Sequence, residues 1–235
     1  MLLEHSGNGL LIKMKQVRKA YTTGKMTFEA LKGVDFQVAK GEFVAIVGPS
    51  GSGKSTMMNI IGCLDIPTGG EYLLDGVMVN SLNSNQLADI RNQKIGFVFQ
   101  AFNLLPYATA YENVEIPLLF AKANAKRRKE RIMELLNRVG LADKINNKPT
   151  EMSGGEMQRV AIARALANDP EVILADEPTG NLDTKSGGGI VDLFHEMWKA
   201  GKTIIIITHD MHIAKQTGRV LKLKDGLVDL NGNGA

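Results

Sequence analysis

The chain has 235 residues, enough for one large domain or two small lobes with a substantial buried core. Hydrophobic residues make up 44% and charged residues 23%, which are ordinary values for a globular protein and exclude a disordered one. The net charge of +3 is too small to indicate a nucleic-acid-binding protein.

The predicted elements begin with three short segments, 11–17, 28–38 and 43–47, whose apolar and β-branched residues indicate strands. Residues 104–167 contain helical patterns, chiefly 125–139 and 154–167, set between apolar runs 95–99 and 172–175 that suit buried parallel strands. A helix over 184–199, a strand over 203–208, a short helix and strands near 220–223 and 227–230 continue a parallel pattern. The sequence predicts an α/β core with an inserted helical lobe.

Basic residues are densest within 126–131, where Glu130 and Glu134 are interleaved with them at helical spacing. Such spacing favours a solvated helix face over a nucleic-acid patch, so no nucleic-acid partner is expected. The cluster consists of Lys126, Arg127, Arg128, Lys129 and Arg131.

Two features point to the cytosol. Cys63 is the single cysteine and has no partner for an internal disulfide, and Met1–Asn8 lacks the apolar core of a signal peptide. No apolar run approaches the roughly 20 residues that a membrane helix needs. If the protein serves a membrane, we expect a partner to do the spanning.

The strongest chemical signal lies between the predicted strand 43–47 and the helical pattern 56–61. Its glycines let the backbone wrap around phosphate at a helix N-terminus, whose dipole favours anions. Lys54 would add charge at the β- and γ-phosphates, and the Ser55 hydroxyl suits Mg²⁺. A chance Gly/Ser-rich turn is disfavoured by the full match and by both flanks. This P-loop runs Gly48, Pro49, Ser50, Gly51, Ser52, Gly53, Lys54, Ser55 and then Thr56.

Two adjacent carboxylates follow the buried strand 172–175, at the strand end where α/β proteins form ligand sites. Asp176 would hold Mg²⁺, directly or through water. Glu177 would orient or deprotonate an attacking water. Two ordinary surface carboxylates are the alternative, which the preceding apolar run disfavours.

A third motif, Ser153 to Glu156, precedes a helical run. Ser153 and Glu156 have the spacing of a capping box, which would be sufficient only to start the helix. Gly154 and Gly155 weaken a helix by about 1 kcal/mol each relative to alanine. Paired glycines here therefore favour a second phosphate-facing helix N-terminus.

With these three motifs in this order, the chain resembles an ATP-binding cassette (ABC) ATPase from about residue 12 to about residue 228. The family signature usually reads Leu-Ser-Gly-Gly-Gln, so Met152 and Glu156 depart from it. Neither change removes the serine hydroxyl or the glycine amides. The resemblance implies a core lobe made of 1–100 and 169–235 and a helical signature lobe at 101–168.

The resemblance also implies residue roles. Tyr21 would stack on adenine, and Gln100 would sense Mg²⁺ and the attacking water. Asp183 would lie at a subunit interface, and His209 would contact the γ-phosphate. Two copies would enclose two ATP molecules head to tail, with one copy supplying Lys54 and Glu177. The other would supply the signature residues Ser153, Gly154, Gly155 and Glu156.

Residues 97–106, 112–118 and 60–65 resemble the branch that contains macrolide exporters and lipoprotein-release ATPases. This implies an ATPase subunit that works on a separate membrane permease, from the inner face of the cell membrane, by transport or by transmitting force. Apolar residues between Phe102 and Phe120 would form a groove for the permease or ordinary core of the helical lobe; the sequence leaves both open.

Two alternatives stay open at this stage. A cell-division-type regulatory ATPase, which acts on a permease without cargo, would have almost the same sequence. A soluble ABC ATPase usually carries a coiled-coil insertion or two fused cassettes, for which this chain has no room. The sequence names no cargo, because substrate contacts in such systems lie in the membrane subunit.

Overall fold

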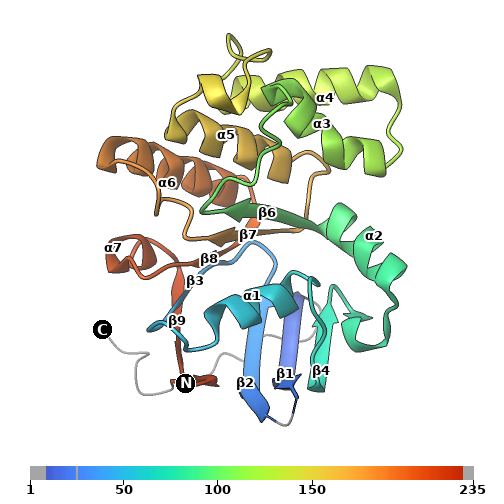
Figure 1. The fold of residues 1–235 in the computed structure, drawn as a ribbon, viewed down its shortest axis with the longest axis vertical. Coiled ribbons are helices and arrows are strands. Elements are labelled where there is room, and N and C mark those ends of the chain that lie inside the picture. Colours follow the sequence, from blue (N-terminus) through green and yellow to red (C-terminus); the bar gives the residue numbers. More distant parts are fainter. Residues whose placement is uncertain (1–8, 25, 230–235) are drawn as a thin grey trace.

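The computed structural model describes residues 9–24 and 26–229, which form two β-sheets flanked by helices (Figure 1). One sheet is antiparallel with strand order β2-β1-β4-β5, and the other has the order β10-β9-β3-β8-β7-β6. The strands are β1 Leu10–Thr23, β2 Met26–Ala39, β3 Phe43–Val47, β4 Gly69–Leu74, β5 Val77–Met78, β6 Ile95–Phe99, β7 Val172–Asp176, β8 Thr203–Ile207, β9 Arg219–Lys224 and β10 Leu227–Val228. The helices are α1 Lys54–Ile61, α2 Ser84–Lys94, α3 Ala110–Phe120, α4 Ala125–Arg138, α5 Gly154–Ala165, α6 Thr184–Lys199 and α7 Met211–Ala214.

The larger sheet is covered on both faces, which explains why β3 and β8 are apolar at nearly every position. Along β8, Ile205 and Ile207 pack with α1 and the antiparallel sheet. Ile204 and Ile206 point the other way and pack with the core of α3 to α6. The predicted fold class, an α/β core with an antiparallel N-terminal part and an inserted helical segment, is confirmed.

The inserted segment contains α3, α4 and α5, between β6 and β7 in the chain. Local sequence starts each helix. Thr109 and Ser153 begin α3 and α5 with capping boxes, and the Asn124 side chain caps α4. The helices then bury apolar faces against one another and against the sheet. We propose that residues 101–168 form one lobe and that 1–100 with 169–235 form the other.

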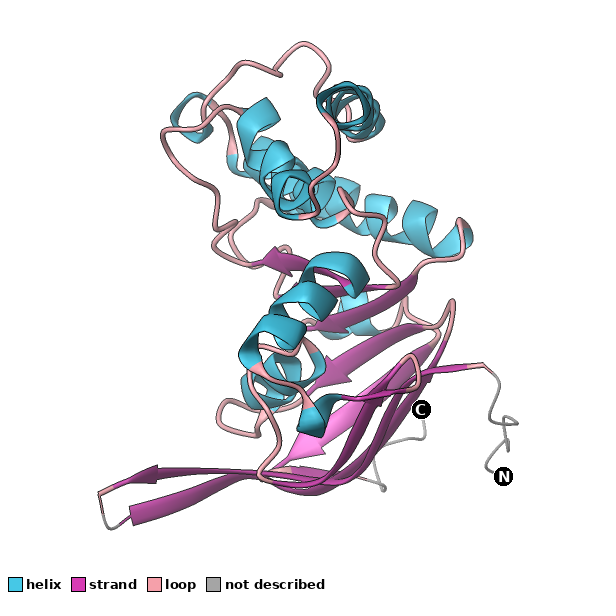
Figure 2. Cartoon of the chain, turned by 90° about the vertical axis from the view of Figure 1, so that its right-hand side faces the viewer, coloured by secondary structure: helices cyan, strands magenta, loops and turns pink. Residues whose placement is uncertain are grey.

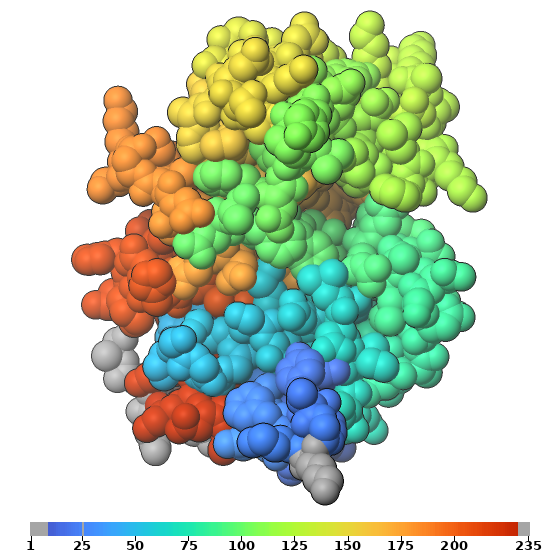
Figure 3. Space-filling view, viewed as in Figure 1, coloured from blue at the N-terminus to red at the C-terminus, as the bar shows by residue number. Residues whose placement is uncertain are grey.

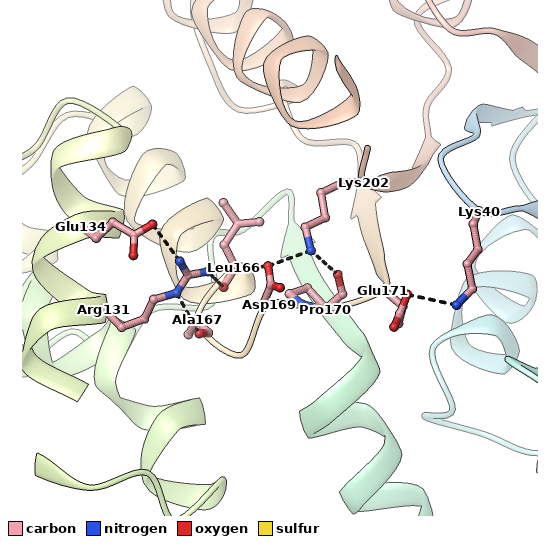
Figure 4. Close-up of polar contacts among 9 residues, drawn as sticks. All are labelled: Lys40, Arg131, Glu134, Leu166, Ala167, Asp169, Pro170, Glu171 and Lys202. Carbon is pink, nitrogen blue, oxygen red and sulfur yellow. Dashed lines mark hydrogen bonds and ion pairs between the residues drawn. The ribbon is translucent and has the colours of Figure 1, made fainter. Parts of the chain in front are cut away.

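A chain of charged side chains joins the helical segment to the sheet at the edge where β7 and β8 begin (Figure 4). Arg131 of α4 donates to the carbonyl oxygen of Leu166 at 2.9 Å, just after α5. Lys202 lies 2.7 Å from Asp169 and donates to the Pro170 carbonyl at 3.1 Å. These contacts fasten α4 and the end of α5 at the edge opposite the P-loop.

The β1–β2 hairpin is longer than the sequence predicts and extends away from the body of the molecule (Figure 2). The first predicted strand ends at residue 17 and the second begins at residue 28, because polar residues lie between them. In the structure the two strands stay paired as far as Thr23 and Met26. Backbone hydrogen bonds between them, rather than burial, hold this outer part together.

Sequence reasoning missed α2 and β4 altogether. No residue of α2 is buried, so it shows no apolar periodicity, although its capping box at Asn83 and Gln86 was a usable signal. The predicted continuation of the parallel pattern is wrong at the end of the chain, because β10 pairs antiparallel with β9. The expectations for Met1–Asn8 and Leu230 lie outside the described residues.

Candidate functional site

The P-loop connects β3 to α1, as its spacing predicts. Two glycines are required by close packing. A Cβ at Gly48 would lie 2.1 Å from the Leu223 carbonyl oxygen, and one at Gly53 would lie 2.7 Å from that of Ala30. Gly53 also has φ of +103°, which favours glycine. The loop is therefore held tightly between β9 and β2.

The N-terminus of α1 lacks a side-chain cap. Gly53 occupies the capping position, whereas a side chain caps every other α-helix in the described part of the chain. The first N–H groups of a helix have no acceptor within the helix. Ser55 and Thr56 lie in the first turn of this helix. This end of α1 suits a bound anion.

Lys54 turns its amine back over the loop. The Nζ atom donates to the carbonyl oxygens of Gly48 at 2.8 Å and Pro49 at 2.9 Å. The hydroxyl of Ser52 is buried without a hydrogen-bond partner. The Lys54 ammonium, the unsatisfied Ser52 hydroxyl and the N–H groups at the start of α1 together suit a bound triphosphate. Ser50 and Gly51 form the exposed outer turn of the loop.

Asp176 ends β7 at the carboxyl edge of the sheet, on the strand beside β8. Burial raises the pKa of its carboxyl group, the neighbouring charge of Glu177 raises it further, and Lys54 opposes the shift. Asp176 and Lys54 are thus near enough to interact. A cation bound beside Asp176 would stabilise its ionised form. Asp176 therefore suits a Mg²⁺ ligand, together with the Ser55 hydroxyl.

Glu177 has a constrained backbone and a fixed side chain. Its φ of +43° lies in the left-handed region, which is unusual for a side-chain-bearing residue. The carboxylate accepts hydrogen bonds from the backbone N–H of His209 at 2.9 Å and from Thr208 Oγ1 at 3.1 Å. His209 Nδ1 lies 2.7 Å from Glu177 Oε1, although 76% of the His209 side chain is exposed. The structure therefore brings Glu177 and His209 together.

Gln100 follows β6 and lies against the loop after Glu177. Its side-chain nitrogen donates to Asn181 Oδ1 at 3.2 Å, and the Asn181 amide donates to the Gln100 carbonyl at 2.9 Å. A Cβ at Gly180 would lie 2.7 Å from the Gln100 amide nitrogen, so that glycine makes room for Gln100. Asn181 was not singled out from the sequence as a site residue.

The capping box predicted for α5 is present. Glu156 accepts from the Ser153 N–H at 2.8 Å, and Ser153 Oγ accepts from the Glu156 N–H at 3.3 Å. Packing gives a second reason for the paired glycines. A Cβ at Gly154 would lie 3.2 Å from Leu182, and one at Gly155 would lie 3.1 Å from Ser186.

Glu156, which departs from the family signature, is neutralised within the chain. Lys144 lies 2.5 Å from its carboxylate. This hydrogen bond and that of the Ser153 N–H lower the pKa of Glu156 to about 2. No sequence pattern connects Lys144 with Glu156, since Lys144 lies in an irregular loop before α5.

Asp183 and Tyr21 lie at the margins of the site. Asp183 caps α6 by accepting from the Ser186 N–H at 2.9 Å, which lowers the pKa of its exposed carboxyl group. Tyr21 lies on the β1–β2 hairpin, paired with Phe28. The hairpin runs past Ala30, the residue against which the P-loop packs.

The P-loop and the Ser153 motif do not meet within one chain. The P-loop helix α1 packs on the face of the large sheet that carries Ile205. Helix α5 packs on the opposite face with Ile204 (Figure 1). The remaining predicted residues lie around the carboxyl ends of β3, β6, β7 and β8. They are Lys54, Asp176, Glu177, His209 and Gln100.

Comparisons with known proteins agree with this geometry. Residues 31–180 match the family model described as ABC transporter. An uncharacterized ABC transporter ATP-binding protein of Thermotoga maritima is 51% identical, over 93% of this chain and 94% of that protein. The macrolide export ATP-binding/permease protein MacB of Brucella melitensis is 48% identical over 93% of this chain but only 34% of its own length.

Solved structures give the same result. The ATP-binding cassette MJ0796, described as a dimer in a post-hydrolysis state with ADP and Pi bound, superposes with a TM-score of 0.85 and 49% identity. The match covers 93% of this chain and 96% of that one. The chain therefore belongs to the ABC transporter family, as a nucleotide-binding cassette that hydrolyses ATP.

Proposed function

We propose that this ATPase powers a separate membrane permease of the macrolide-export or lipoprotein-release type, through ATP-driven head-to-tail dimerisation. One observation carries the dimer: α1 and α5 present two phosphate-suited N-termini on opposite faces of one sheet. A second copy, related by a two-fold axis, would place its α5 against the first copy's α1. The dimeric structures of the cassette MJ0796 support this arrangement.

In the proposed reaction, the P-loop amides and Lys54 bind the β- and γ-phosphates. Mg²⁺, held by Ser55 and Asp176 with Gln100 nearby, would supply charge that offsets the charge developing on the phosphates. Glu177 orients the attacking water and His209 contacts the γ-phosphate. Loss of γ-phosphate contacts then favours opening of the dimer.

A groove of about 610 Å³ offers a docking place for the permease. Its walls are α2 and β6 on one side and α3 on the other, and it opens between their atoms in Figure 3. Phe97, Phe99, Pro117 and Phe120 give it an apolar lining, and Phe120 is 75% exposed. An apolar segment of a permease would cover this surface.

The groove divides the region that the sequence left open. Ala110, Val114 and Leu118 of α3 belong to the core, whereas Ile116, Pro117 and Phe120 line the groove. The core expectation is therefore met by one side of α3, and the groove for the permease stays a proposal for the other side. The other wall, which α2 and β6 supply, was not expected from the sequence.

No helix within residues 9–24 and 26–229 is long and apolar enough to cross a bilayer. The proposed location is the inner face of the cell membrane, through contact with the permease. MacB carries its permease in the same polypeptide as its ATP-binding part, according to its name.

The catalytic assignment is tested with Glu177→Gln. This variant should bind ATP with unchanged affinity, hydrolyse it at least about 100-fold more slowly and accumulate as a dimer with ATP. Phosphate release and size-exclusion chromatography measure these effects. Glu171→Gln is the matched control, because Glu171 precedes the same strand at its opposite end. Rapid turnover by Glu177→Gln would refute the role of Glu177.

The permease proposal is tested by purifying the tagged chain from gently solubilised native membranes and identifying co-purifying proteins by mass spectrometry. A stoichiometric permease is expected for the unaltered chain and for Tyr107→Glu, but not for Phe120→Glu. Tyr107 is the control because it is 89% exposed yet lies outside the groove. Recovery of cytosolic proteins alone would contradict the proposed membrane role.

A further inference from the structure

The side chain of Tyr21 is partly exposed and contacts a cation. About 40% of the residue is exposed, and the ammonium of Lys19 lies over its ring, 5.0 Å from the ring centroid. Lys19 and Tyr21 are two positions apart on β1, so their side chains leave the strand on the same side. A cation therefore lies over the ring, and the exposed part of the ring can accept a flat partner.

Lys19 is unusual because its side chain is buried. The residue is 8% exposed, whereas lysine is almost never buried without a partner. Its Nζ lies 2.5 Å from Asp65 Oδ1 and donates to the Ile66 carbonyl at 3.0 Å. Both partners belong to the loop between α1 and β4. The ammonium thus ties β1 to the loop that follows the P-loop helix.

Asp65 completes the arrangement. Its second oxygen accepts a hydrogen bond from the Tyr21 hydroxyl at 3.1 Å. Burial opposes ionisation of this carboxyl group, but the hydrogen bonds and charge of Lys19, with the Ile66 N–H, lower its pKa overall. The ionised carboxylate therefore fixes both the cation beneath the Tyr21 ring and the hydroxyl at the end of the ring.

We propose that Lys19 and Asp65 are positioning residues that preorganise Tyr21 for the nucleotide base. The inference rests on the proposed stacking of adenine on Tyr21 and extends it to the residues behind the ring. A tyrosine on an extended hairpin has rotamer freedom, which a stacked base would have to restrict on binding. The Lys19–Asp65 pair restricts it beforehand, and it couples the base site to the loop after α1.

No conclusion about Lys19 was possible from the sequence, where it is one of several lysines in an alternating strand. Asp65 ends the segment 60–65, which was used only to compare subfamilies. Their meeting depends on the pairing of β1 with β4, which brings the loop before β4 beside the hairpin.

The test compares ATP with inorganic tripolyphosphate, which fills the P-loop but has no base. Tyr21→Phe removes only the hydrogen bond to Asp65, and Lys19→Met removes the cation while keeping an apolar stem. Each should raise KM for ATP about 5-fold with kcat changed less than 2-fold. Tripolyphosphate, measured as a competitive inhibitor of ATP hydrolysis, should bind all variants equally. Arg18→Gln is the control, because Arg18 forms an exposed ion pair with Glu29 on the same hairpin.

The outcomes separate the inference from the proposed function. Tyr21→Ala should weaken ATP binding more than either variant, which tests the stacking itself. If Tyr21→Ala weakens ATP binding while Tyr21→Phe and Lys19→Met do not, the positioning role is wrong and the stacking stands. If tripolyphosphate binding falls in parallel with that of ATP, the pair supports only the fold, and the inference is overturned. If Tyr21→Ala changes nothing, both ideas fail.

Discussion

Three consecutive glycines, Gly187 to Gly189, lie in the first turns of α6, the helix that Asp183 caps. Glycine in a helix interior costs roughly 1 kcal/mol relative to alanine, because it loses more backbone freedom on folding. A methyl group at Gly188 or Gly189 would meet no atom within 4 Å. Nothing in the folded chain therefore requires a glycine at either position.

Gly188→Ala should accordingly stabilise the protein by about 1 kcal/mol, since Gly188 is exposed and its backbone is helical. For a chain of this size, that change corresponds to a rise in Tm of about 2–4 °C. The Gly188→Ala/Gly189→Ala double variant should show about twice the shift. Gly96→Ala is the opposite control, because its Cβ would lie 2.4 Å from the Ala165 carbonyl oxygen.

Thermal unfolding followed by circular dichroism measures these shifts, and ATPase assays run alongside. We expect Gly188→Ala to raise Tm and Gly96→Ala to lower it. A Tm of Gly188→Ala at or below that of the unaltered chain would refute the reasoning from helix propensity. A raised Tm with loss of ATP-induced dimerisation would instead indicate that a second copy packs closely against Gly188.

Three further predictions concern ionic and thiol groups. Lys144 and the Ser153 N–H together lower the pKa of Glu156 from 4.5 to about 2, so these contacts contribute their full stability above pH 4.5 and lose it as pH falls toward 2. Lys144→Met should therefore lower the urea midpoint at pH 7 more than at pH 3. Arg131→Met removes donors to the carbonyl oxygens of Leu166 and Ala167 and should cost about 1–2 kcal/mol in urea unfolding. Burial raises the pKa of Cys63 to about 11, so iodoacetamide at pH 8 should alkylate it only after unfolding, as mass spectrometry would show.

The core sheet and the P-loop could be predicted because each depends on local sequence. The apolar run Phe43–Val47 and the glycines after it determine both a buried strand and the turn that we propose binds phosphate. The capping box could also be predicted, because Ser153 and Glu156 lie three positions apart in the sequence. In each case the residues that cooperate lie within a few positions of one another.

Contacts between distant segments were not accessible in the same way. Lys19 meets Asp65 across 46 positions, and Lys144 meets Glu156 through a loop without regular structure. Gly154 and Gly155 show a related difficulty, because glycine at these positions can be explained both by phosphate binding and by close packing. Their packing against Leu182 and Ser186 becomes visible only when α6 is placed beside α5.

The capping state of α1 and α5 bears on how the proposed dimer divides the work of binding ATP. The N-terminus of α1 has no side-chain cap, whereas two of the four free N–H groups at the start of α5 are already satisfied by Ser153 and Glu156. In the dimer that we propose, α1 would therefore bind the triphosphate first and most tightly, and α5 of the second copy would add only the Gly154 and Gly155 amides and the Ser153 hydroxyl. A contact with so few donors depends strongly on the γ-phosphate, so hydrolysis would release the second copy while ADP stays on the first.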